Sequence, residues 1–138
     1  MDLSDFLGPN PIIVDLQAED RWDAIDELLD HLVKHQKIKP DNRSAIGDAV
    51  KKREKSMTTG IGFGIAIPHA STDLVAEVVG IAGRSRRGVR FDSLDLKPVR
   101  TVLLFLVPRG EFQKHLHTLA NIAKLLHKIG PDGFDDGA

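Results

Sequence analysis

The chain contains no cysteine, and this absence removes several kinds of chemistry at once. Disulfide bonds, thiol nucleophiles and zinc sites built on thiolates are all excluded. No apolar run approaches the ~18 residues that a membrane-spanning helix needs, and Met1 to Asp5 lack the basic and apolar regions of a signal peptide. We therefore expect a cytoplasmic protein without direct membrane insertion.

The sequence also lacks an excess of charge of either sign. It contains 19 Lys and Arg residues and 20 Asp and Glu residues, which gives a formal net charge of -1. Nucleic acid is not favoured as a partner, since binding it usually requires a basic patch or stripe. The densest basic cluster, Arg84-Ser85-Arg86-Arg87, is interpreted as a solvated loop. The length of 138 residues, with 41% hydrophobic and 28% charged residues, is typical of one globular domain with a full core.

Periodicity along the chain predicts an α/β protein. Apolar runs predict strands and helical spacing predicts helices. The expected strands are 11–16, 65–67, 75–82, a short edge strand 89–91, and 99–107, and the expected helices are 21–35, 40–55 and 111–128. The near-continuous apolar run of 99–107 predicts a strand that is buried on both faces.

This order of elements predicts a mixed, mostly parallel β-sheet flanked by α-helices. No internal repeat or linker is visible, so residues 1–138 are expected to form a single domain. The last residues, 130–138, are rich in Gly and Asp and are expected to form a loose tail.

The stretch from Thr58 to Ala70 contains three glycines, Gly60, Gly62 and Gly64, and then an apolar run that ends on Pro68 and His69. Glycine permits tight turns, and proline fixes its own φ and restricts the preceding residue. The pattern predicts a histidine held at a strand end beside a glycine-rich loop, which is how one imidazole nitrogen can be aimed. The glycines fit neither a dinucleotide fingerprint nor a nucleotide P-loop. A surface histidine or a satisfied core histidine is the alternative interpretation.

The helix expected over 111–128 contains further histidines. Helical geometry places His115 at the edge of the apolar stripe, where helix meets sheet, and His117 on the solvated face. A boundary histidine without a role is the alternative for His115. His31 and His35 lie four residues apart, but no H-E-x-x-H pattern is present, and no metal site is predicted. Arg53 ends the second helix, where a surface cation is favourable in any protein.

The segment from Thr59 to His69 resembles the signature of enzyme IIA proteins of the fructose–mannitol–nitrogen class. These proteins belong to the bacterial phosphoenolpyruvate-dependent phosphotransferase system. The Phe-Asp and Pro-Val segments of the family are similar to Val89–Leu94 and to Pro98-Val99. Leu104–Pro108 followed by His115–Leu119 resembles the nitrogen-regulatory branch in particular. The resemblance runs from about Ile12 to Leu126.

The resemblance implies that His69 accepts a phosphoryl group and that His115 is the second histidine of the active site. It also implies that Arg53 is the arginine preceding the glycine loop, and that Thr59 is a hydroxyl of the motif. Amides of the loop glycines Gly60, Gly62 and Gly64 are expected to contact the phosphoryl group. Such chemistry is coherent without a metal or cofactor, and the implied fold is the mixed sheet flanked by helices of this family.

The implied partners are proteins. The donor is expected to be HPr or its nitrogen-branch paralogue. The acceptor is expected to be an enzyme IIB in a sugar-uptake system, or a regulated protein in a regulatory branch. Similarity in the last helix favours the regulatory branch, with sugar uptake as the alternative. A hydrolase using His69 and His115 is not favoured, because no third residue at a recognisable spacing orients a base.

The sequence departs from the family pattern at two places. Phe63 stands where the family commonly has a small polar residue, and an aromatic ring there is expected to alter loop packing or the docking surface. The family also continues into a further C-terminal helix, where this chain has its Gly- and Asp-rich segment.

Overall fold

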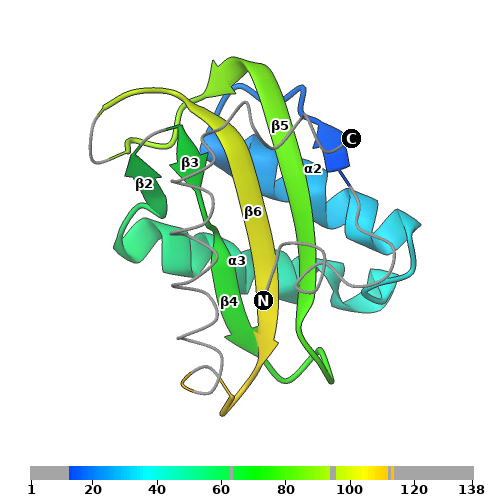
Figure 1. Cartoon of the computed structure of the whole chain (residues 1–138). Helices are drawn as coiled ribbons and strands as arrows, with labels where there is room; N and C mark the ends of the chain where they lie inside the picture. The colour runs from blue at the N-terminus through cyan, green and yellow to red at the C-terminus, as the bar shows by residue number, and fades with distance from the viewer. Residues whose placement is uncertain (1–12, 63, 94–95, 112, 114–138) are drawn as a thin grey trace.

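In the computed structural model, residues 13–62, 64–93, 96–111 and 113 are described. They form one six-stranded mixed sheet with helices along one of its faces (Figure 1). In chain order the elements are β1 (Ile13–Asp15), α2 (Arg21–Lys34), the short 3-10 helix η1 (Pro40–Asn42), α3 (Arg43–Ser56), β2 (Gly60–Gly62), β3 (Ile65–Ala66), β4 (His69–Thr72), β5 (Val79–Val89) and β6 (Val99–Pro108). The α/β class with a mixed sheet, predicted from the sequence, is confirmed.

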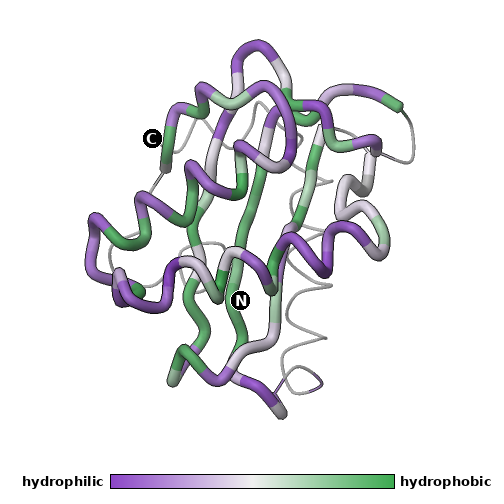
Figure 2. The backbone as a smooth tube through the Cα atoms, turned by 180° about the vertical axis from the view of Figure 1, so that it is seen from behind, coloured by the Kyte–Doolittle hydropathy of each residue, from purple (hydrophilic) through white to green (hydrophobic). Residues whose placement is uncertain are grey.

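The two α-helices follow the predicted apolar spacing. Asp20 begins α2 by accepting a hydrogen bond from the Asp23 amide at 2.9 Å, which satisfies one of the open donors of the first turn. The second predicted helix is present, but its first residues form η1, because Pro40 starts a tighter turn before α3. Figure 2 shows both helices alternating between apolar and polar residues over a largely apolar sheet.

The strands lie in the order β1-β5-β6-β3-β2, and β4 pairs with β6 as well. Among the described residues, β1–β5, β3–β6 and β4–β6 are parallel, whereas β2–β3 and β5–β6 are antiparallel. The strand β6 therefore has β5 on one side and both β3 and β4 on the other. This central position accounts for its unbroken apolar sequence.

Burial of β6 on both faces, which its sequence predicts, is confirmed. Only Arg100 is exposed among its ten residues. Leu104 and Leu106 join the core beneath α2 and α3. Leu103 and Phe105 alternate with them along the strand, so they lie on the opposite face, and each is only 1% exposed.

Pro68 divides one line of parallel pairing into β3 and β4. Ile65 pairs with Thr101 and His69 pairs with Phe105, so the register is the same on both sides of the proline. The Pro68 carbonyl accepts a hydrogen bond from the Phe105 amide at 3.1 Å, but proline has no amide to donate. The sequence predicted that His69 follows a strand end. In the structure His69 begins β4, so that prediction was incomplete.

Three predictions about the segment 75–91 were wrong. The strand begins at Val79 rather than Val75, and it continues through the basic cluster, which was interpreted as a loop. Ser85 is buried while Arg86 and Arg87 are exposed, so only these two arginines form the solvated part of the cluster in β5. Residues 89–91 do not form the separate edge strand that was expected. Val89 is the last residue of β5 and pairs with Val99 after a register shift between Arg84 and Val89, and Arg90 forms an isolated bridge with Asp20.

The helix expected over 111–128, with His115 and His117, lies almost entirely outside the described residues, as does the tail 130–138. Residues 11 and 12 of the first expected strand also lie outside them. Within the described ranges, no helix combines the length and the apolar character that crossing a membrane requires.

Candidate functional site

His69 is fixed by a contact with the backbone two residues before it. Its Nδ1 lies 2.9 Å from the Ile67 carbonyl oxygen. A carbonyl can only accept, so Nδ1 carries the proton and donates it. In the neutral ring the lone pair then belongs to Nε2. The stiff Ile67-Pro68 peptide therefore selects the tautomer as well as the direction of the ring.

The ring of Phe105 forms a platform for the ring of His69. The two centroids lie 5.1 Å apart and the planes differ by 6°. The stack follows from the strand register, because His69 and Phe105 are paired residues of β4 and β6, and paired side chains share a face of the sheet.

Half-burial on this platform lowers the pKa of His69 below its ordinary value of 6.5, and burial is the largest influence. The hydrogen bond to the Ile67 carbonyl acts in the opposite direction. The positive charge of Arg53 lowers the pKa further, and the negative charge of Glu54 raises it. The net result is a histidine that is mostly neutral near pH 7.

His69 opens into a hollow of about 590 Å³. Its lining residues come from α3, β4 and the segment after β6, and they are Ala49, Lys52, Arg53, Ser56, His69, Ala70, Ser71 and Arg109. Three of them, Lys52, Arg53 and Arg109, are cationic, and none is acidic. Arg109 also lies 3.3 Å from the Asp73 carboxylate in an exposed ion pair. The hollow therefore suits an anionic group placed close to His69.

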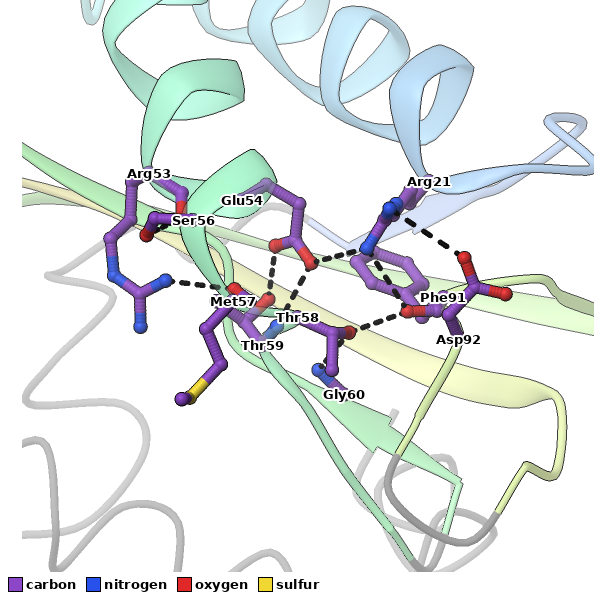
Figure 3. A network of polar contacts seen from close by, with 10 residues as sticks. All are labelled: Arg21, Arg53, Glu54, Ser56, Met57, Thr58, Thr59, Gly60, Phe91 and Asp92. Atoms are coloured by element: carbon purple, nitrogen blue, oxygen red, sulfur yellow. Dashed lines mark hydrogen bonds and ion pairs between the residues drawn. The ribbon is translucent and has the colours of Figure 1, made fainter.

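Arg53 lies in the last turn of α3, as the sequence predicted, and shares this hollow with His69. Its Nη1 donates a hydrogen bond to the Met57 carbonyl at 2.8 Å. This bond satisfies a carbonyl beyond the helix end and holds the guanidinium in place (Figure 3). The arginine therefore has a structural contact in addition to its place in the hollow.

Thr59 and the glycines are not among the residues that line the hollow. Thr59 is 4% exposed and bonds to Glu54, and the Gly60 amide donates to Thr58 Oγ1 at 3.1 Å (Figure 3). Gly62 and Gly64 have φ values of 93° and 76°, which only glycine adopts readily. In the described residues, these glycines shape the turn between β2 and β3.

Four further residues considered in the sequence analysis are not among the described residues that line the hollow. His115 and Phe63 lie outside the described residues. His31 and His35 stack at the C-terminal end of α2, with their ring centroids 6.4 Å apart, and neither residue lines the hollow. The described part of the chain holds no group of three or more side chains arranged to bind a metal ion.

Sequence reasoning missed four residues of this region: Lys52, Glu54, Phe105 and Arg109. For Glu54 a signal was available, because it follows Ile46 and Val50 at helical spacing and so lies on the buried face of α3. For Phe105 and Arg109 the sequence offers no local signal. Their places beside His69 depend on parallel pairing of β4 with β6, which the sequence did not predict.

The comparisons with known proteins show to which family the chain is similar. The family described as "Phosphoenolpyruvate-dependent sugar phosphotransferase system, EIIA 2" matches residues 5–129. A nitrogen regulatory protein of Bradyrhizobium diazoefficiens is 34% identical over 126 residues, which cover 91% of this chain and 80% of that protein. The fructose-specific EIIA component of a phosphotransferase system in Haloferax volcanii is 36% identical over 132 residues, which cover 93% and 84%.

Solved structures of the same kind share the fold. The nitrogen regulatory protein IIA-Ntr of Neisseria meningitidis superposes with a TM-score of 0.76 at 28% identity, covering 88% of this chain and 82% of that one. The complex of enzyme IIA and phosphorylated enzyme IIB for mannitol from Escherichia coli matches with a TM-score of 0.66 at 25% identity, covering 83% and 79%.

Proposed function

The chain belongs to the EIIA 2 family of the phosphoenolpyruvate-dependent sugar phosphotransferase system, and from this premise we propose that it carries a phosphoryl group on Nε2 of His69. The observation that carries the proposal is the bond between His69 Nδ1 and the Ile67 carbonyl, in a hollow lined by three cations. It gives Nε2 the lone pair and surrounds the site with positive charge.

The transfer step balances without a metal. The lone pair of Nε2 attacks the phosphorus of a donor phosphohistidine, and the donor's N–P bond breaks as the new one forms. The donor ring, protonated on its second nitrogen, leaves as neutral imidazole. His69 keeps its Nδ1 proton, and the Ile67 carbonyl supports the positive charge that develops on the ring. Positioning and electrostatics do most of the work in such transfers.

Arg53 is proposed to bind the phosphoryl oxygens, because its planar guanidinium matches their geometry. Thr59 and the glycines Gly60, Gly62 and Gly64 are proposed to shape the loop beside the phosphoryl group. His115 is proposed as the second histidine of the site, on its sequence match alone, since it lies outside the described residues.

For the partners, we propose an HPr-like donor and a place in the nitrogen-type regulatory branch. The similarity to nitrogen regulatory proteins in sequence and in structure supports this branch. The alternative is sugar uptake with an enzyme IIB as acceptor, which the fructose-specific relative and the mannitol complex support.

Phosphorylation with purified phosphoenolpyruvate-dependent donor enzymes tests the function. We expect the intact mass of the wild type to increase by one acid-labile, alkali-stable phosphoryl group, and that of His69→Ala to stay unchanged. Equal labelling of both proteins would remove His69 from the proposal. Mixing the labelled protein with an enzyme IIB then tests the branch, because rapid loss of the label to IIB favours sugar uptake.

A further inference from the structure

Glu54 is a charged side chain in a place where charge is costly. It lies in the last turn of α3, directly after Arg53, and is 1% exposed. A carboxylate out of water is destabilising unless other groups bond to it. Its partners therefore show what the buried charge holds in place.

Both carboxylate oxygens of Glu54 bond to the same residue, Thr59. Oε2 accepts the Thr59 amide at 2.9 Å, and Oε1 accepts the Thr59 hydroxyl at 2.6 Å (Figure 3). Charge-assisted bonds of this kind are about twice as strong as neutral ones. Arg21 lies 3.4 Å from Oε2 on the other side. Glu54 thus fixes the backbone and the side chain of Thr59 together.

From Thr59 two further bonds lead to the nucleophilic histidine. The Thr59 carbonyl accepts the Ile67 amide at 3.0 Å. The Ile67 carbonyl accepts the His69 Nδ1 proton at 2.9 Å. Glu54, Thr59, Ile67 and His69 therefore form one chain of hydrogen bonds, which we call the Glu54 relay. Every link except the last is made inside the protein by a buried residue.

We propose that Glu54 is a positioning residue for phosphoryl transfer, which acts through Thr59 and Ile67 to hold the Nδ1–H tautomer and the ring direction of His69. The proposal rests on the proposed function of His69. Loss of the carboxylate lets Thr59 move, the Ile67 carbonyl follows, and the ring can populate the Nε2–H form. That form has no lone pair at the attacking nitrogen.

A purely structural role for Glu54 is the competing explanation, because any change at a buried position of α3 destabilises the fold. Val50 supplies the matched control. It lies one turn earlier on the same buried face of α3, is fully buried, and does not line the hollow. Val50→Ala should therefore lower stability without touching the Glu54 relay.

The first measurement is the tautomer of His69 in the unphosphorylated full chain, from ring ¹⁵N chemical shifts above the ring's pKa. We expect the Nδ1–H form to dominate in the wild type and in Val50→Ala. In Glu54→Ala the Nε2–H fraction should increase about tenfold. Glu54→Gln and Thr59→Val each weaken the bonds between Glu54 and Thr59. These two variants replace Glu54→Ala in the measurement if that variant does not fold. Wild-type tautomer ratios in folded Glu54→Gln and Thr59→Val would overturn the proposal.

The second measurement is the rate of transfer from a phosphorylated HPr-type donor. Displacement of a reacting group by about 1 Å can cost about a hundredfold, so we expect the maximal rate in Glu54→Gln to decrease between tenfold and a hundredfold. The donor KM should stay unchanged, because Glu54 does not reach the surface. A decrease no larger than that of Val50→Ala would reduce Glu54 to a structural role. If the wild type takes up no phosphoryl group at all, the proposed function fails, while the tautomer measurement still decides on the relay.

Discussion

At the scale of single residues, the site depends on how a few side chains are held rather than on unusual chemistry. His69 is an ordinary imidazole whose tautomer is set by a backbone carbonyl and whose pKa is lowered mainly by burial. Arg53 is an ordinary helix-terminal cation whose guanidinium is tied to the Met57 carbonyl. Each of these two residues can therefore be tested by a substitution or a titration of that residue alone.

The lowered pKa of His69 predicts two pH dependences. The transfer rate should decrease as pH falls through the folded-state pKa of His69, which lies below 6.5, because the folded ring then becomes protonated. As pH falls, the free energy of unfolding should begin to decrease at a higher pH than the transfer rate does. The unfolded chain takes up the proton from about pH 6.5 downwards, before the folded protein does, so the free energy of unfolding decreases as pH falls. The slope from His69 disappears only well above pH 6.5, where the ring is neutral in both the folded and the unfolded chain.

A titration of the ring by NMR, with unfolding curves on both sides of pH 6.5, checks this prediction. His69→Gln is the control, because it should lose the part of the pH slope that comes from His69. A ring pKa above 6.5 would contradict the prediction.

For Arg53 we expect Arg53→Lys to separate function from stability. The helix-terminal charge is retained, and such a charge contributes about 0.3–1 kcal/mol, so the melting temperature should change little. The planar fork is lost, and losing a preorganised donor to transition-state charge costs about a hundredfold in rate. Transfer assays and thermal unfolding of the same preparations measure both effects. An unchanged rate together with reduced stability would make Arg53 a structural residue.

At the scale of elements, two adjacent pieces of strand place the site. β3 and β4 run along β6 in one register, with Pro68 between them, and this register puts His69 over Phe105. The turn before β3 is fixed as well, because the Gly64 carbonyl accepts the amides of Arg100 and Thr101 at 2.8 and 2.9 Å. The direction in which the chain enters β3 therefore depends on Gly64.

Gly64→Ala should destabilise the fold and slow transfer. The φ of 76° at Gly64 costs a residue with a Cβ roughly 1–2 kcal/mol, which corresponds to a decrease of about 3–10 °C in melting temperature. The strain is relieved most easily by moving β3, and His69 with it. Gly88→Ala is the comparison, since Gly88 has a φ of 91° in β5 and lies outside the hollow. Its added Cβ would also lie 2.7 Å from the Pro98 Cβ, so its loss of stability should be at least as large.

Thermal unfolding and transfer rates of both variants test this prediction. Both should melt at a lower temperature, and only Gly64→Ala should lose transfer activity beyond the loss of folded protein. Equal transfer rates per folded protein in the two variants would show that the turn at Gly64 does not position His69.

The elements also show what the sequence could predict. The apolar run of β6 and the helical spacing of α2 are local signals, and both predictions are confirmed. The basic cluster from Arg84 to Arg87 was misinterpreted, because charged residues are common in loops and the pairs on either side, Arg84 with Thr101 and Val89 with Val99, are not local. His69 and Arg53 were selected from their motif, and both line the hollow. The platform of Phe105 and the relay through Glu54 were missed, because they exist only after strands and helix have packed.

At the scale of the whole molecule, charge is distributed unevenly. The formal net charge is -1, yet the hollow around His69 is lined by Lys52, Arg53 and Arg109 with no acidic residue. A local field of this kind acts on the approach of a phosphorylated donor as well as on the bound group. It is screened by salt, with a Debye length of about 8 Å at physiological ionic strength.

Lys52→Gln should therefore slow the second-order reaction with the phosphorylated donor by about fivefold at low salt, equivalent to about 1 kcal/mol for one pair of charges at 4 Å in water. The difference from the wild type should shrink as salt is added. Lys55→Gln is the control, because Lys55 is exposed on the same helix and does not line the hollow. Equal losses in both variants would point to net charge rather than to the hollow.

The central place of β6 also sets the order in which backbone amides exchange with deuterated solvent. Amides of a strand that is hydrogen-bonded on both sides and buried on both faces exchange only through the rarest openings of a protein. The strand β2, which ends the sheet among the described residues, pairs with β3 through a bulge at its glycines and should exchange far sooner. His69 is therefore attached to the slowest-opening part of the molecule, and the glycine loop to a faster one. A partner that contacts β2 need not disturb β6, the strand along which β4 and its first residue, His69, are paired.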